Sequence, residues 1–133
     1  VLRKQLEADS RVSLVSDVGV DSSGKIPYPK IAIEVAENIA RGHGDRGLLI
    51  CGTGIGMAIA ANKVSGIRAA TCHDSYSVER SVLSNNAQIL TLGERVIGLE
   101  LAKRLVDEWL NYEFDLDSSS AKKVQVISEY EER

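Results

Sequence analysis

The chain is organised around residues 46–62, RGLLICGTGIGMAIAAN. Within them, the apolar run 48–50 is bounded by glycines, which is typical of a buried parallel strand rather than a strand with one solvated face. Alternating glycines follow, and after them come the small residues of a helix predicted over 55–63. This stretch therefore predicts a strand, a glycine-rich turn and a helix packed closely together.

The glycine-rich turn has the composition of an anion site. Gly52, Gly54 and Gly56 let backbone N–H groups converge at the start of the following helix, where unpaired amides and the helix dipole favour negative charge. The turn opens with Cys51 and carries Thr53 two positions later. Because a helix N-terminus stabilises a thiolate, the same turn also suits a sulfur base or nucleophile. An ordinary strand–helix turn with a buried structural cysteine has the same residues, so the loop alone leaves both interpretations open.

Three familiar loop types are excluded by spacing. The dinucleotide fingerprint needs G-x-G-x-x-G, whereas the glycines here alternate as far as Gly56 and are followed by Met57. A P-loop ends in Gly-Lys-Ser/Thr, but the next lysine along this chain is Lys63. A cysteine phosphatase loop closes with an arginine six residues after its cysteine, where this chain has Met57.

Size and charge set the broad class. The 133 residues predict one domain over 1–133. Lys and Arg number 16 against 19 Asp and Glu, and a net charge of −3 gives no general attraction to nucleic acid or to an anionic membrane. The uncharged run 47–62 falls short of the roughly 20 apolar residues of a membrane helix. Two cysteines at the ends of strand-like runs suit a reducing compartment. We therefore expect a cytoplasmic protein with no nucleic-acid or membrane partner.

Strands and helices are predicted to alternate along the chain. Strands are expected at 11–17, 67–72 and 87–92, and helices at the start of the chain and over 29–42, 75–83, 97–110 and a last segment carrying Val124, Ile127 and Tyr130. This alternation favours an α/β fold: a Rossmann-like, doubly wound, mainly parallel sheet with helices on both faces. In such sheets ligands bind beyond the carboxyl ends of the strands. The Cys51 turn, residues 72–74 and the turn after Leu92 all belong to that edge.

The first residues already read as a helix, without an initiator methionine or a capping residue before it. An α/β fold normally begins with a strand. We therefore expect a short N-terminal strand and turn to be missing from this chain.

Several motifs, in this order, resemble the type B ribose-5-phosphate isomerases, which belong with the LacA/LacB sugar-phosphate isomerases. They are LICGTGIG at 49–56, AANK at 60–63, GIRAA at 66–70, and Asn85 followed by GERVIG at 93–98. The resemblance runs from about residue 17 to residue 127. It implies a homodimer or homotetramer with active sites shared between subunits, a C-terminal helix packed on a partner subunit, and neither cofactor nor metal. It also implies reversible aldose–ketose isomerisation of a phosphorylated sugar through a cis-enediolate.

This reaction needs one base that moves a proton between C1 and C2, and donors for the oxyanion of the enediolate. By the resemblance, Cys51 is the base and Thr53 hydrogen-bonds beside it. Gly52, Gly54 and Gly56 then form the amide cradle. The chemistry implied by the resemblance agrees with the anion site and activated sulfur expected from the residues themselves.

Four further residues match binding positions. Tyr28 and Asn85 correspond to substrate-facing residues, and Arg95 corresponds to a phosphate-binding arginine. Lys123 stands in the C-terminal segment where the family offers arginines to the phosphate of a neighbouring subunit; a lysine supplies the charge but not the bidentate fork. A rim aromatic for Tyr28, a surface cation for Arg95 and a solvated helix start for Lys123 are the structural alternatives.

Two departures from the family pattern bear on the substrate. The family's N-terminal Gly-x-Asp-x-Ala-Gly turn is absent, and Ser84 stands where pentose-acting members carry a ring-opening histidine; the histidines here are His43 and His73. A tetrose 4-phosphate cannot close a furanose, because its O4 is esterified, and so it needs no such residue. Residues 73–80 and 84–88 also resemble the branch that acts on erythrulose 4-phosphate.

We therefore predict interconversion of D-erythrulose 4-phosphate and D-erythrose 4-phosphate. Interconversion of ribose 5-phosphate and ribulose 5-phosphate is the alternative. A phosphosugar- or nucleotide-binding module without catalysis is the alternative of another class, since a fold does not fix a function.

Overall fold

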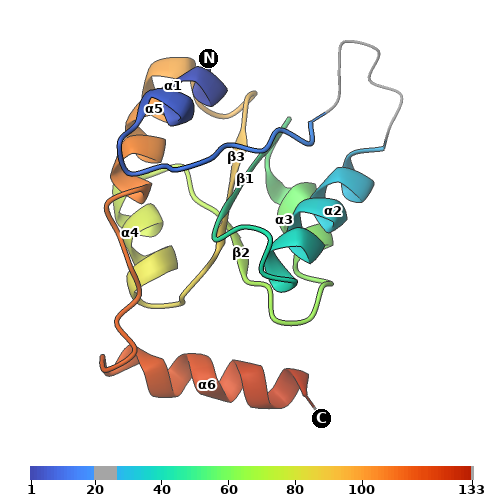
Figure 1. The fold of residues 1–133 in the computed structure, drawn as a ribbon, viewed down its shortest axis with the longest axis vertical. Helices are drawn as coiled ribbons and strands as arrows, with labels where there is room; N and C mark the ends of the chain where they lie inside the picture. Colours follow the sequence, from blue (N-terminus) through green and yellow to red (C-terminus); the bar gives the residue numbers. More distant parts are fainter. Residues whose placement is uncertain (20–26, 133) are drawn as a thin grey trace.

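The computed structural model describes residues 1–19 and 27–132, which form an α/β fold around a parallel sheet (Figure 1). The described strands are β1 (Gly47–Cys51), β2 (Ala69–Thr71) and β3 (Ile89–Gly93), in the order β1-β3-β2. Every residue of the central strand β3 is buried. The register pairs Cys51 with Gly93, so β1 and β3 end side by side. The predicted strand–turn–helix unit is confirmed, with α3 (Ile55–Ala61) following β1.

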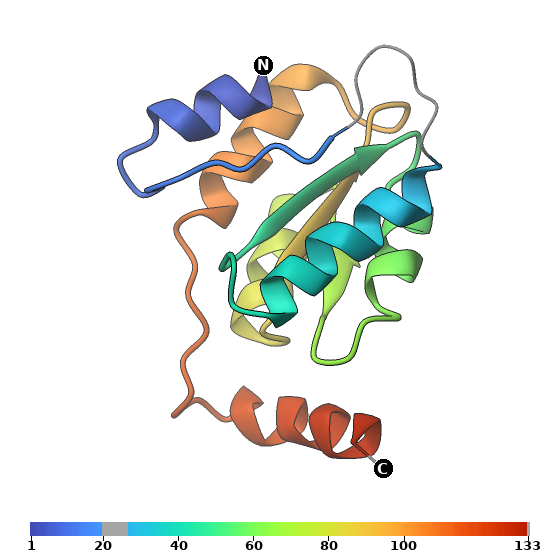
Figure 2. The same ribbon diagram turned by 45° about the vertical axis from the view of Figure 1, so that its right-hand side comes forward.

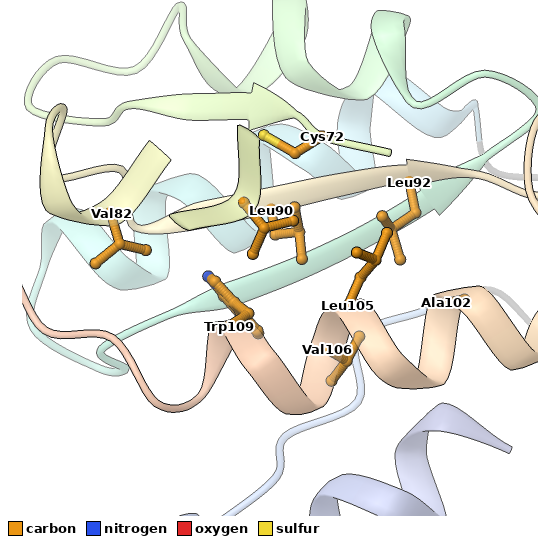
Figure 3. Close-up of a cluster of buried hydrophobic side chains, with 9 residues drawn as sticks. Cys72, Val82, Leu90, Leu92, Ala102, Leu105, Val106 and Trp109 are labelled. Atoms are coloured by element: carbon orange, nitrogen blue, oxygen red, sulfur yellow. The ribbon is translucent and has the colours of Figure 1, made fainter. Parts of the chain in front are cut away.

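Helices cover both faces of the sheet, as predicted. Helices α2 (Tyr28–Ala40) and α3 lie on one face, and α4 (Ser75–Leu83) and α5 (Leu99–Trp109) lie on the other, with α1 (Leu2–Ala8) beside α5 (Figures 1 and 2). Two apolar cores result from the alternation of side chains along the strands. Leu90 and Leu92 face Leu105, Val106 and Trp109 of α5 (Figure 3). On the other face lies a second cluster: Ala32, Ala36, Leu49, Met57, Ala61, Ile67 and Ile89.

The last helix, α6 (Ser120–Glu131), lies beyond the end of the sheet from which the strands begin (Figure 1). The N–H of Gly66, just before β2, donates to Oε1 of Glu131 at 2.6 Å. Of the three apolar residues that the sequence placed on this last helix, Val124 is buried, but Ile127 is 52% and Tyr130 is 64% exposed. Most of the apolar surface of α6 is therefore not covered by its own chain.

The strand predicted over 11–17 is wrong. Residues 12–18 form no strand, and the half-buried positions are Val12, Val15 and Val18, whereas Leu14 is 83% exposed. Burial every third residue is incompatible with a pleated strand, in which side chains alternate in twos. The alternation of residue types in this segment indicated that a strand was possible, but no described strand pairs with it.

Two smaller expectations are also corrected. Strand β2 is only three residues long, and Arg68, which was expected inside it, lies outside; the Nε of Arg68 donates to the carbonyl of Asn86 at 2.8 Å. On α5 the helical spacing of Leu101, Leu105, Val106 and Trp109 indicated one apolar face, but Leu101 is 39% exposed and Ala102 lies in the core instead. The other predicted helices and strands are present, most of them with ends displaced by a few residues.

Candidate active site

The turns that follow β1 and β3 are joined by backbone hydrogen bonds. The N–H of Glu94 donates to the carbonyl of Cys51 at 2.9 Å, and the N–H of Arg95 donates to the carbonyl of Gly52 at 3.0 Å. These bonds continue the pairing of the two strands beyond their last residues. The turn of residues 93–95 and the loop of residues 51–56, called the Cys51 loop below, therefore lie side by side at the carboxyl edge of the sheet, as the order of the elements predicted.

Cys51 is half-buried at this edge, and its sulfur accepts a hydrogen bond from the N–H of Gly54 at 3.1 Å. An N–H donor interacts more strongly with an anionic acceptor than with a neutral one. Thr53 is exposed, and its Oγ1 accepts from the N–H of Ile55 at 3.2 Å. The second sulfur, Cys72, is buried, and burial raises the pKa of its thiol. Cys51 is therefore the accessible thiol of the two.

Close approach of the two strand ends explains two of the glycines. Gly54 has φ +81°, and a Cβ there would lie 2.9 Å from the carbonyl carbon of Leu92. A Cβ on Gly93 would lie 2.6 Å from the backbone of Thr53. Only glycine at both positions lets the Cys51 loop pack directly on the end of β3.

Two threonines support the Cys51 loop from beneath, and sequence reasoning missed both. Thr91 is fully buried, and its Oγ1 lies 2.8 Å from the carbonyl oxygen of Gly54; Oγ1 of Thr71 lies 2.7 Å from Oγ1 of Thr91 and 3.2 Å from the same carbonyl. The two hydroxyls have one hydrogen each, so they can donate in only two of these three contacts. The shorter distances assign Thr91 as the donor to Gly54 and Thr71 as the donor to Thr91. Their register on neighbouring strands, which places them opposite each other, cannot be seen from spacing along the chain.

Tyr28 and Arg95 flank the loop. A Cβ built on Gly56 would lie 2.3 Å from the hydroxyl of Tyr28, and one built on Gly52 would lie 3.5 Å from Cδ of Arg95. The tyrosine ring therefore lies against the start of α3, and the arginine side chain lies over the first glycine of the loop. Tyr28 is 48% exposed and Arg95 is exposed, so both can meet a ligand at this edge. The structure thus brings both predicted binding residues to the Cys51 loop.

Asn85 and Lys123 are not brought to that loop within one chain. Asn85 follows α4 and precedes β3, and its Nδ2 donates to the carbonyl of Arg80 at 2.9 Å. Lys123 belongs to α6, at the same end of the sheet. The five residues of β3 span about 16 Å between this end and the Cys51 loop.

One more side chain reaches the site edge. Nε2 of His73, two residues after β2, accepts a hydrogen bond from the N–H of Gly93 at 2.8 Å. The position of His73 directly after a predicted strand was a signal that it lies at this edge. Its acceptor role became visible only once β2 and β3 were paired.

Within residues 1–19 and 27–132, no group of three or more His, Cys, Asp or Glu side chains is placed to hold a metal ion. In the same part of the chain, no helix has the length and apolar character needed to span a bilayer.

Comparison with known proteins identifies the family. The model of a family described as Ribose/Galactose Isomerase matches residues 1–127. The chain is 64% identical over 131 residues to D-erythrulose-4-phosphate isomerase 2 of Mycolicibacterium smegmatis, covering 98% of this chain and 86% of the relative. It is 53% identical over 118 residues to D-erythrulose-4-phosphate isomerase of Pectobacterium atrosepticum, covering 88% and 77%.

Its structure is similar to that of the type B ribose 5-phosphate isomerase of Leishmania infantum, with a TM-score of 0.92, 38% sequence identity, and coverage of 98% of this chain and 86% of the other. The relatives are sugar-phosphate isomerases by name, and the matched region includes the Cys51 loop and the turn of residues 93–95. The chain belongs to the Ribose/Galactose Isomerase family, and it is an aldose–ketose isomerase.

Proposed function

We propose that this enzyme interconverts D-erythrulose 4-phosphate and D-erythrose 4-phosphate, with Cys51 as the base. The observation that carries this assignment is the sulfur of the half-buried residue Cys51, which accepts from the N–H of Gly54 at the carboxyl edge of the sheet, beside Arg95. A sulfur base, amide donors and a cation are the groups that proton transfer on a phosphosugar requires.

The proton path follows from the chemistry of the substrate. Cys51 removes a proton from C1 of the ketose, and the C2 carbonyl oxygen takes up the electron pair as the C1–C2 double bond of a cis-enediolate forms. The same proton, or one exchanged with solvent, returns to C2, while the O1 hydroxyl proton moves to O2. The amides of the loop 52–56 that do not already donate to Cys51 or Thr53 stabilise the oxyanion, and Arg95 binds the phosphate. No oxidant or reductant is needed, because C1 and C2 exchange oxidation states.

The tetrose assignment rests on two observations. The relatives named D-erythrulose-4-phosphate isomerase are 64% and 53% identical to this chain. Ser84 occupies the position at which the family resemblance expects a ring-opening histidine, and a tetrose 4-phosphate is already open. The type B ribose 5-phosphate isomerase fold favours ribose 5-phosphate as the second candidate substrate.

We further propose that the active site is completed by a second copy in a homodimer or homotetramer. Asn85 and Lys123 lie at the end of the sheet opposite the Cys51 loop of their own chain, and the length of β3 separates them from it, which is too far for one small sugar to touch all three. The apolar side chains of Val126 and Ile127 on α6 are 65% and 52% exposed and supply surface for packing on that copy. The free thiols of Cys51 and Cys72 suit the cytoplasm as its place of action.

Steady-state kinetics on both substrates test the assignment. With the full-length protein, we expect kcat/KM for D-erythrulose 4-phosphate to exceed that for ribose 5-phosphate by about 100-fold or more, because only the pentose needs its ring opened. A preference for ribose 5-phosphate would contradict the tetrose assignment and support the pentose alternative. Turnover of neither substrate would favour a phosphosugar-binding module.

A further inference from the structure

The turn of residues 93–95 is fixed from both sides. On the β1 side, the N–H groups of Glu94 and Arg95 donate to the carbonyls of Cys51 and Gly52. On the β2 side, the N–H of Gly93 donates to Nε2 of His73 at 2.8 Å. The hydrogen bond toward β2 is therefore made to a side chain, whereas the hydrogen bonds toward β1 are made to backbone carbonyls.

Parallel strand geometry explains why a side chain is needed there. Successive residues of a strand direct their N–H and C=O groups to opposite neighbours. The carbonyl of Thr91 accepts from the N–H of Cys72 at 3.3 Å, so Gly93, two residues later, directs its N–H toward the same neighbour. Because β2 ends at Thr71, the ladder offers Gly93 no carbonyl at that level. The imidazole of His73 takes the place of that carbonyl.

A displacement of Gly93 would be transmitted to the candidate active site. The backbone of Gly93 is packed so closely on Thr53 that a single added carbon would lie 2.6 Å from it. Two residues further on, the side chain of Arg95 lies over Gly52. The bond to His73 therefore bears on the position of the Cys51 loop and of the arginine together.

The bond also identifies the acceptor atom of the ring. A nitrogen that accepts from an amide carries no proton, so Nε2 is the acceptor and the ring hydrogen in this arrangement is on Nδ1. The neighbouring charged group, Asp74, is hydrogen-bonded elsewhere. Its carboxylate caps α4 by accepting from the N–H of Ser77 at 2.8 Å, and the hydrogen bonds from Ser77 lower the pKa of Asp74.

We propose that His73 is a positioning residue of this isomerase, which replaces a missing strand carbonyl and so fixes the turn bearing Arg95 against the Cys51 loop. The proposal rests on the function proposed above for Cys51 and Arg95. His73 itself does not touch the reacting carbons in this assignment; it acts through Gly93.

Three substitutions separate this role from simple packing. In His73→Gln, the side-chain oxygen reaches as far as Nε2 and can still accept from Gly93. In His73→Asn, the oxygen stands at the position of Nδ1 and is too short, and His73→Ala removes the acceptor altogether. His43→Gln, in an exposed turn after α2, is the matched control. If His73→Ala fails to fold, the comparison of His73→Gln with His73→Asn still distinguishes the positioning role from simple packing.

The first readout is amide hydrogen exchange at Gly93, which needs no substrate. We expect exchange at Gly93 to accelerate about 10-fold or more in His73→Asn and His73→Ala, and to stay near wild type in His73→Gln and His43→Gln. The second readout is kinetic: kcat/KM for the phosphosugar falls about 10-fold or more in the Asn and Ala variants, largely through KM, and is restored in the Gln variant. Equal exchange at Gly93 in wild type and His73→Asn, or equal kinetics of the Gln and Asn variants, would overturn the proposal.

Failure of the proposed function is recognised separately. If the wild-type enzyme turns over neither phosphosugar, the rate at which iodoacetamide alkylates Cys51, followed on the peptide that contains it, replaces the kinetic readout. A rate that changes at least about 3-fold in His73→Asn and not in His73→Gln supports the positioning role. The same rate in all variants would overturn it.

Discussion

Gly54 combines two requirements that no other residue type meets. Its φ of +81° lies in the left-handed region, and its Cα abuts the backbone of Leu92. Its N–H also donates to the sulfur of Cys51. The geometry of the loop and the surroundings of the sulfur therefore depend on the same glycine.

Comparing alanine substitutions at two glycines separates the cost of a positive φ from the cost of a steric clash. We expect Gly54→Ala to lower the free energy of unfolding by about 3 kcal/mol or more, because backbone strain adds to a clash with backbone that cannot move aside. Gly42→Ala is the control, since Gly42 has φ +83° but a Cβ there meets nothing within 4 Å; its cost is about 1 kcal/mol. Urea unfolding measures both. Equal losses in the two variants would show that the close approach to Leu92 is unimportant.

Among single residues, the sequence predicted those whose role depends on neighbours in the chain. Cys51 and the alternating glycines could be recognised because the turn, the helix start and the sulfur are neighbours in the chain. Thr71, Thr91 and His73 were not assigned roles at the site, because each acts through a partner 17 to 37 residues away. The register that brings such partners together is a property of the sheet.

Helices and strands were predicted correctly where their apolar residues pack into the core of the chain. Helix α4 was predicted with its observed bounds, and the structure shows that Asp74 caps it and that Val78 and Val82 are its buried apolar residues. Helix α5 was also predicted, and Ala102 rather than Leu101 belongs to its buried face. The segment 11–17 was mispredicted, because alternation shows only which side chains could share a face, while a strand also needs a neighbour to pair with.

The C-terminal helix illustrates the same limit. A last helix carrying Val124, Ile127 and Tyr130 was predicted, and α6 is present. Only Val124 is buried by the chain itself. An apolar stripe in a sequence predicts a buried face, but it does not say whether the covering surface belongs to the same chain.

For the whole molecule, the separation of Asn85 from Cys51 makes the proposed sharing of sites testable. Chains carrying Cys51→Ala or Asn85→Ala are each expected to be strongly impaired. After the two are unfolded together and refolded as a 1:1 mixture, half of the pairs are hybrids with one intact site, so activity recovers to about a quarter of wild type. Mixing without refolding is the control. Absence of recovery, with hybrid pairs shown to be present by mass spectrometry, would mean that Asn85 and Cys51 serve no common site.

The most direct test of the account is deuterium transfer in heavy water by the wild-type enzyme, Cys51→Ala and the buried-thiol control Cys72→Ala. With D-erythrulose 4-phosphate as substrate, we predict that the wild-type enzyme and Cys72→Ala place deuterium at C2 of the D-erythrose 4-phosphate formed. Cys51→Ala is predicted to bind the phosphosugar but to lose about 100- to 10,000-fold in rate, the usual contribution of a general base. Exchange by Cys51→Ala at the wild-type rate would contradict the assignment of Cys51 as the base.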